Sequence, residues 1–335
     1  MKKTEKHNRI RKKSLAALLA VVLALTALFG SACGSPGGSS SGGRETGEQT
    51  IPEESEVPMS PYHLEPKTSG YQPPEFLDAV FNAQKAEGTD EFAIDLSSIA
   101  DGYVAVHTHC DARVKFQVTK DELTFTYDVV NDKDQIFPLP YGDGEYAFRA
   151  LKNISDSKYA VLYTCEAQVK LTNEFSPFLR PSQYADYTEE SDCVKMAKEF
   201  AEDAATREDF IAQVYLYVTE NITYDHEKAA TVKAPYFPEP DAIMEEKKGI
   251  CFDYASLAAS MLRSQGIPTK IIFGYVAPDD LYHAWNMFYT EEGGWVLVEL
   301  AVNEEWNRID LTFAASHDDV SYVGDGTNYV DAYAF

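Results

Sequence analysis

The sequence predicts an α+β fold in which an N-terminal antiparallel β-sandwich is followed by a domain with a helix packed on an antiparallel sheet. Two observations predict this order. Residues 75–186 contain short alternating runs rich in Val, Tyr, Phe and Thr, as in half-buried strands. From residue 187 apolar residues recur at helical spacing, and strand-like runs return only after about residue 270. The 335 residues are enough for about two such domains.

Residues 1–33 have the three-part layout of a secretory signal peptide. Seven Lys and Arg residues precede Ser14, an uncharged apolar run extends from Leu15 to Gly30, and small residues lead to Cys33. The apolar run is shorter than the roughly 20 residues that a helix needs to span a bilayer. We therefore expect an export signal rather than a permanent transmembrane anchor.

A flexible tether, residues 34–74, begins directly after Cys33 with GSPGGSSSGG. A cysteine in this position resembles the lipidated cysteine of bacterial lipoproteins, although Gly30 stands where those proteins usually have Leu. The resemblance implies a lipid on Cys33 that holds the protein at the outer face of the cell membrane. Cleavage after Ala32, followed by secretion, is the alternative. Both interpretations place the protein outside the cytoplasm.

The predicted sandwich, residues 75–186, consists of several short strands separated by Asp, Asn, Gly and Lys turns. The segment Pro177 to Tyr187 contains two prolines and no periodicity, which is typical of a connection between domains.

The second predicted domain, residues 187–335, starts with two helices that are broken near Thr206. A short helix is expected at Asp241 to Lys247 and a longer one at Cys251 to Gln265, which Gly266 ends. The later apolar runs predict four strands, at residues 270–276, 284–289, 295–302 and 306–313.

The chemistry-bearing residues lie in this second domain. Cys251 follows the Gly249 turn at the start of a predicted helix, where free N–H groups and the helix dipole favour a thiolate and can also bind an oxyanion. His283 stands 32 residues later in a predicted strand, and Asp310 ends another. A thiol nucleophile needs a base, and the base needs a carboxylate that fixes its orientation. Asp253 is expected to cap the helix rather than to react.

These segments resemble the transglutaminase-like superfamily of papain-type thiol enzymes. The residues that carry the resemblance are GICFDYASLAASMLRSQGIPTKIIFGYV, HAWN and WNRIDLTF. The resemblance implies that Cys251 is the nucleophile, His283 the general base and acid, and Asp310, four residues after Trp306, the orienting carboxylate. The tail YVGDGTNYV and the upstream sandwich are similar to surface lipoproteins of Gram-positive bacteria.

Two further residues belong to the predicted site. Glu299 is a possible alternative acid because it follows Trp295 by four residues and His283 by only 16. Asp310 is preferred because Thr312 and an aromatic residue follow it, as in the family pattern. Trp285 is expected to line or shield the site, with a place in the core as the other interpretation.

The expected function is acyl transfer on amide bonds of a peptide or protein at the cell surface, with no cofactor and no metal. Peptidase-like hydrolysis is favoured over transamidation because a secreted enzyme meets more water than amine. A catalytically inactive binding or adhesion lipoprotein is the alternative. The formal net charge of −25 excludes a general nucleic-acid binder. The oligomeric state is left open.

Outside this site, His107 and His109 share one face of a predicted strand without a visible third ligand, which favours solvent-facing histidines over a metal site. Cys110 and Cys165 could bridge two strands, but an odd cysteine, Cys193, would remain, so no disulfide framework is implied.

Overall fold

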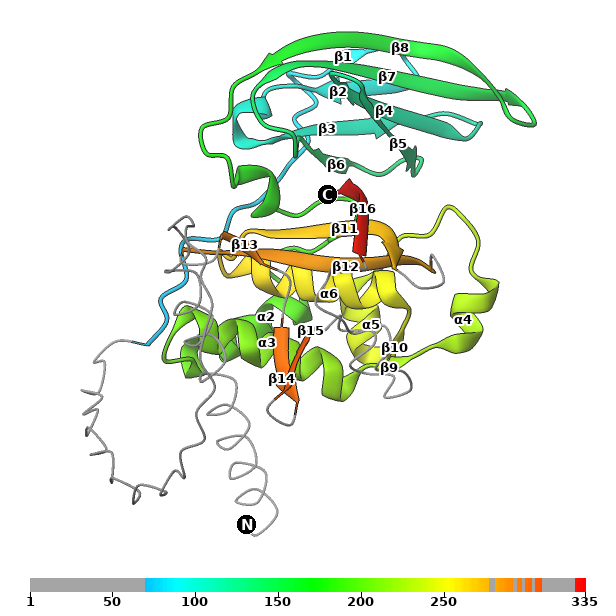
Figure 1. Cartoon of the computed structure of the whole chain (residues 1–335). Helices are drawn as coiled ribbons and strands as arrows, with labels where there is room; N and C mark the ends of the chain where they lie inside the picture. The colour runs from blue at the N-terminus through cyan, green and yellow to red at the C-terminus, as the bar shows by residue number, and fades with distance from the viewer. Residues whose placement is uncertain (1–69, 277–280, 292–293, 297–298, 303–304, 309–328) are drawn as a thin grey trace, which may run out of the picture.

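The computed structural model describes residues 70–276, 281–291, 294–296, 299–302, 305–308 and 329–335. Two four-stranded antiparallel sheets fill the first half, and a layer of helices with a further antiparallel sheet fills the second (Figure 1). The α+β class predicted from the sequence is therefore confirmed. Within the described residues, no helix has the length and apolar character needed to cross a membrane.

The sandwich pairs its strands only in antiparallel fashion. One sheet has the order β1-β2-β3-β6 and contains β1 (Glu87–Gly88), β2 (Phe92–Asp95), β3 (Tyr103–Thr108) and β6 (Gln135–Pro138). The other has the order β5-β4-β7-β8 and contains β4 (Val114–Lys120), β5 (Leu123–Val129), β7 (Gly144–Ser155) and β8 (Lys158–Val169). Phe116 of the second sheet contacts Phe92 and Phe137 of the first, with ring centroids 6.0 Å and 4.9 Å away. Burial of such rings between the sheets holds the sandwich together.

After a short 3₁₀ helix, η2 (Ser176–Phe178), the chain enters two helices, α2 (Asp192–Asp203) and α3 (Arg207–Asn221). The predicted break near Thr206 is confirmed: the Thr206 hydroxyl accepts a 3.0 Å hydrogen bond from the backbone N–H of Asp209 and caps α3. This bond satisfies one of the N–H groups that a helix leaves without a partner at its start.

A series of short elements leads to the predicted cysteine. They are β9 (Thr223–Tyr224), α4 (His226–Thr231), α5 (Pro240–Glu246) and β10 (Lys248–Gly249), and α6 (Cys251–Ser264) follows. β9 and β10 pair in parallel, so the residues directly before α6 lie beside the strand that follows α3. The helices expected at 241–247 and 251–265 are confirmed within one residue at each end.

The four-stranded antiparallel sheet of the second half has the order β13-β12-β11-β16. It contains β11 (Thr269–Val276), β12 (Leu281–Thr290), β13 (Gly294–Val296) and β16 (Tyr329–Ala334). The single strand expected at 295–302 is wrong, because β13 ends at Val296 and β14 (Glu299–Val302) pairs instead with β15 (Glu305–Arg308). Of the strand expected at 306–313, β15 covers the start, and residues 309–313 lie outside the described residues.

One continuous cluster of buried apolar side chains runs through both halves of the chain. The ring of Phe335 lies at the junction, 5.5 Å from Tyr127 of the sandwich, 5.0 Å from Tyr184 of the connection and 5.6 Å from Phe273 of β11. The buried Arg263 of α6 donates to the carbonyl oxygens of Phe335 and Thr269, at 2.9 Å and 2.8 Å. The sandwich and the sheet next to α6 therefore share one core.

Candidate active site

Cys251 is the first residue of α6 and is half-buried. The N–H of Tyr254 bonds to the Ile250 carbonyl at 3.1 Å, so the regular helix begins directly at the cysteine. The N–H groups of the first helical residues have no carbonyl of their own helix to bond. The thiol therefore sits at the positive end of the helix dipole, as the sequence predicts.

The carboxylate of Asp253 closes the first turn of α6 and is fully buried. Its Oδ2 accepts a 2.8 Å hydrogen bond from the N–H of Ile250, and Lys228 of α4 lies 2.7 Å from the same oxygen. The hydroxyl of Tyr236 donates to Oδ1. The expected capping role of Asp253 is confirmed, whereas its two side-chain partners are not apparent in the sequence, because they lie 25 and 17 residues away.

His283 and Trp285 lie in β12 and are almost fully buried, at 3% and 2% exposure. Their rings are near parallel, with centroids 6.2 Å apart. Trp285 also packs with Ile272 and Val276 in a second small cluster, on the face of the sheet opposite the one that α6 covers. Trp285 therefore lies in a core, which is the other interpretation given above, and its role in lining the site stays a prediction.

Contacts between α6 and the β11–β12 pair show how the cysteine helix is aligned with the histidine strand. The Phe252 ring lies 4.8 Å from that of Phe273, which pairs with Ala284, and the side chain of Asn286 donates to the carbonyl of Ala255 at 3.0 Å. The helix α6 and the strand β12 therefore run in the same direction. Because Cys251 precedes the first contact on the helix and His283 precedes it on the strand, the backbones of both residues lie toward the same end of the sheet.

Tyr282 is a residue of this region that the sequence analysis missed. It is about half exposed, and its ring stacks 6.2 Å from Phe273 on the side of α6. Burial raises the pKa of Tyr282, and the neighbouring tyrosines and Cys251 raise it further. Alternation along β12 puts His283 on the other face from Tyr282. In the sequence, the position of Tyr282 directly before His283 was the signal that could have singled it out.

Of the two candidate acids and the expected lipidation site, the structure describes only the backbone of Glu299. Asp310 and Cys33 lie outside the described residues. The backbone of Glu299 begins β14, where it pairs with Arg308 of β15.

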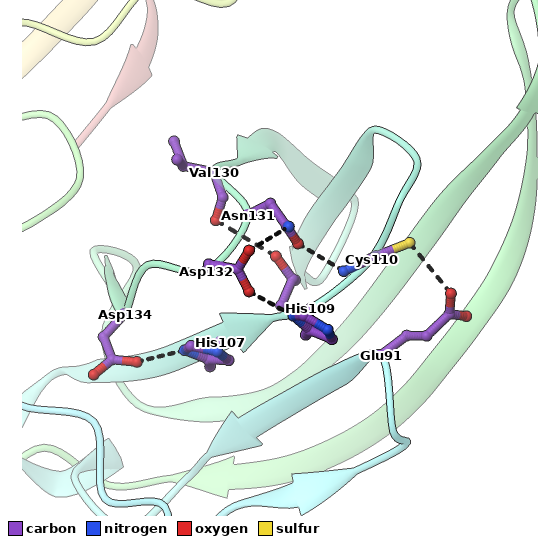
Figure 2. A network of polar contacts seen from close by, with 9 residues as sticks. Glu91, His107, His109, Cys110, Val130, Asn131, Asp132 and Asp134 are labelled. Carbon is purple, nitrogen blue, oxygen red and sulfur yellow. Dashed lines mark hydrogen bonds and ion pairs between the residues drawn. The ribbon is translucent and has the colours of Figure 1, made fainter.

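His107 and His109 each bind an aspartate on the surface of the sandwich. Nδ1 of His107 lies 2.7 Å from Oδ1 of Asp134, and Nδ1 of His109 lies 2.6 Å from Oδ1 of Asp132 (Figure 2). The His107 and His109 side chains are 37% and 78% exposed, which confirms solvent-facing histidines. The Asp132 carboxylate raises the pKa of His109. Within the described part of the chain, no three potential metal ligands come together.

Among the described residues, four cysteines have free thiols, at positions 110, 165, 193 and 251. Cys110 donates to the Glu91 carboxylate at 3.5 Å, so the possible bridge between Cys110 and Cys165 is absent. Burial, together with nearby Glu87, raises the pKa of Cys165 to about 12, and burial raises that of Cys193 still further.

With this geometry established, comparison with known proteins identifies the second half of the chain. The sequence model of the transglutaminase-like superfamily matches residues 194–300. This segment is a transglutaminase-like superfamily domain. The matched segment includes Cys251, His283, Trp285 and Glu299, and it ends before Asp310.

Solved structures of similar proteins share little sequence with this chain. A cysteine protease candidate from Cytophaga hutchinsonii is 16% identical over 75% of this chain and 73% of that chain, with a TM-score of 0.35. The periplasmic domain of TgpA from Pseudomonas aeruginosa is 15% identical over 63% of this chain and 93% of that chain, with a TM-score of 0.30. Red sea bream transglutaminase is 11% identical over 62% of this chain and 48% of that chain, with a TM-score of 0.26. No curated protein matches the chain.

Proposed function

We propose that the transglutaminase-like domain is a thiol acyl-transfer enzyme that acts on amide bonds of peptides or proteins outside the cytoplasm. The observation that carries the proposal is the placement of Cys251 at the first residue of α6, at the same end of the sheet as His283. Cys251 supplies the thiol and His283 the imidazole that a thiol enzyme needs as its nucleophile and its base.

In the proposed reaction the Cys251 thiolate attacks the amide carbonyl carbon and forms a C–S bond. The N–H groups at the start of α6 stabilise the oxyanion. As the C–N bond breaks, His283 gives its proton to the leaving amine, and a thioester remains on Cys251. Water then attacks the thioester, His283 takes its proton, and the acid product leaves with the thiol restored. An amine in place of that water gives transamidation.

Hydrolysis is the preferred outcome because water is far more concentrated than any amine around an exported enzyme. Asp310, with Glu299 as the alternative, is the carboxylate that would fix the imidazole.

The first test measures how fast Cys251 is alkylated by iodoacetamide between pH 5 and pH 9. We expect Cys251 to react at least about tenfold faster than glutathione at pH 7, and His283→Ala to remove this enhancement. His109→Ala is the matched control because that histidine is exposed on the sandwich. A wild-type rate equal to that of glutathione would contradict the enzyme and favour the inactive binding lipoprotein.

The second test separates the two enzymatic outcomes. The protein is incubated with a quenched peptide library, with and without a primary amine such as cadaverine. New peptide amino termini identify hydrolysis, and amine incorporation with a loss of ammonia identifies transamidation. Cys251→Ser must abolish either product.

We also propose that the protein is exported and held at the membrane by a lipid on Cys33, with secretion after cleavage at Ala32 as the alternative. The basic, apolar and small-residue order of residues 1–33 supports this location. Cys33→Ser should move the protein from the membrane to the soluble fraction and abolish incorporation of a labelled fatty acid. Unchanged fractionation without label would instead support simple secretion.

A further inference from the structure

The buried carboxylate of Asp253 has partners on both of its oxygens. Oδ2 accepts from the Ile250 N–H at 2.8 Å and lies 2.7 Å from Lys228 Nζ, while Oδ1 accepts from the Tyr236 hydroxyl. Burial and this hydrogen bond raise the pKa of Tyr236 well above its usual value, so Tyr236 stays protonated and donates. An ideal Cβ on Gly249 would lie 2.6 Å from the Asp253 Cβ, which shows how tightly the carboxylate is enclosed.

Lys228 and Tyr236 come from the segment between β9 and α5, most of which is exposed (Figure 1). Asp225 caps α4 by accepting from the N–H of Lys228 at 2.9 Å, and its own N–H donates to the Gly249 carbonyl at 2.9 Å. Lys228 Nζ also lies 4.6 Å above the Tyr236 ring. This segment is therefore attached both to the turn before Cys251 and to the first turn of the cysteine helix.

The Tyr236 ring makes a second contact with the same turn. Its centroid lies 6.2 Å from that of Phe252, in an edge-to-face arrangement. Since Phe252 and Asp253 directly follow Cys251, Tyr236 is in contact with the next two side chains of the helix. Cys251 thus belongs to a first helical turn whose side chains are contacted by Lys228 and Tyr236 from outside α6.

Stability alone does not require this ion pair. Buried ion pairs often contribute no more to stability than apolar residues of the same size, because both charges lose their hydration. A buried carboxylate two residues after the nucleophile also has an electrostatic consequence: without a cation, its charge opposes negative charge on the cysteine sulfur. A lysine at 2.7 Å removes this opposition while the cap is kept.

We propose that Lys228 and Tyr236 are positioning residues for the nucleophile: they neutralise and fix the buried Asp253 carboxylate, which holds the first turn of α6 in place around Cys251. The inference rests on the proposed function and extends it, because it assigns a role to two residues that neither the family comparison nor the sequence motifs single out.

Several charged or titratable groups lie on the cysteine helix and on the elements next to it. They are Asp253 and Tyr254 on α6, Lys228 on α4, Tyr236 before α5, Lys248 on β10, and Tyr282 and His283 on β12. Among the residues that the structure describes, Lys228 alone forms an ion pair with the carboxylate of the cysteine's own helix turn, at 2.7 Å. Its removal is therefore the most direct test.

The experiment measures the pH profile of Cys251 alkylation by iodoacetamide in the full chain. We expect Lys228→Met to slow alkylation at pH 7 about tenfold and to move the midpoint of the profile up by about one pH unit. Lys228→Arg keeps the charge and should stay within about threefold of the wild type. The matched control is Lys233→Met, which removes one charge from an exposed side chain of the same segment and should change the rate less than about twofold.

The double variant Asp253→Asn with Lys228→Met distinguishes charge compensation from packing. With the carboxylate gone, no charge needs compensation, so alkylation should recover to within about threefold of the wild type. A structural role alone predicts that the double variant is as slow as Lys228→Met or slower. Tyr236→Phe keeps the ring on Phe252 and removes only the hydroxyl donor. It should therefore slow alkylation of Cys251 as well, but by a smaller factor than Lys228→Met.

Two results would overturn the inference: Lys228→Met and Lys233→Met reacting alike, or no recovery in the double variant. Circular dichroism melts confirm that each variant is folded. If Lys228→Met does not fold, the comparison of Tyr236→Phe and the double variant with the wild type decides the question. Failure of the proposed function is separate, since it would appear as slow alkylation of the wild-type protein itself.

Discussion

The side-chain amide of Asn286 on β12 donates to the carbonyl of Ala255 on α6 at 3.0 Å and to the carbonyl of Lys270 on β11 at 3.2 Å. Asn286 is buried, so water competes little for these bonds. One amide therefore connects the cysteine helix to both central strands of the sheet. Ala255 lies one helical turn after Cys251, and Asn286 lies three residues after His283.

We predict that Asn286→Ala lowers the free energy of unfolding by about 1–3 kcal/mol, because two carbonyls lose a donor in a buried place. Urea denaturation checks this value. Gln84→Ala, an exposed amide on the sandwich, is the control and should change stability by less than about 0.5 kcal/mol. Equal effects of the two changes would mean that the Asn286 bonds contribute nothing.

Gly249→Ala should affect both stability and reactivity. The new Cβ would lie 2.6 Å from the Asp253 Cβ, so the capping carboxylate must shift. We expect slower alkylation of Cys251 together with a lower melting temperature. Gly142→Ala is the comparison: its φ of 73° strains the backbone but leaves the new Cβ in open space, so stability falls while alkylation stays unchanged. Wild-type alkylation of Cys251 in Gly249→Ala would contradict the close approach of residue 249 to the Asp253 side chain.

The native protein should show a fixed order of cysteine labelling at pH 8. The pKa of Cys165 is raised from 9.0 to about 12, which lowers its thiolate fraction at that pH about a thousandfold. The pKa of Cys193 is raised in the same direction, so both thiols stay protonated and react more readily only as the pH approaches their raised pKa values. Mass spectrometry of labelled peptides should therefore find Cys251 modified first.

The control for labelling is Cys251→Ser, which should leave Cys165 and Cys193 unlabelled in the native protein, whereas both react in urea. Fast native labelling of Cys165 would show that its surroundings are more open than the structure indicates.

The two candidate acids can be separated by isosteric amides. The sequence favours Asp310, so Asp310→Asn should lower turnover by about a hundredfold or more, because the imidazole loses the carboxylate that orients it. Glu299→Gln should then retain most activity. The reverse pattern would assign the role to Glu299, which lies inside the matched family segment, and full activity of both variants would exclude a triad with either acid.

Local signals account for what the sequence predicted well. Thr206 caps α3 through a residue three positions away, and Cys251 begins a helix whose apolar spacing is regular, so neighbouring residues determine both. The helix α4 was missed because the six residues HEKAAT carry no apolar period and depend on the Asp225 cap. The break between β13 and β14 was missed because the apolar run continues through it.

Distant partners account for what the sequence could not predict. Lys228 and Tyr236 reach Asp253 across 25 and 17 residues, and the aspartates that bind His107 and His109 lie 27 and 23 residues away. Such pairs arise only when separate elements are packed together, and one sequence carries no record of that packing. The alignment of α6 with β12 through Asn286 belongs to the same class.

The shared core around Phe335 makes the sandwich and the thiol domain a single cooperative unit. A fragment that begins near residue 187 would leave Phe335 and Phe273 without Tyr127 and Tyr184, and apolar rings exposed in this way favour aggregation. Calorimetry of the intact chain should therefore show one transition rather than two. The sandwich would thus act as a folding partner of the transglutaminase-like domain.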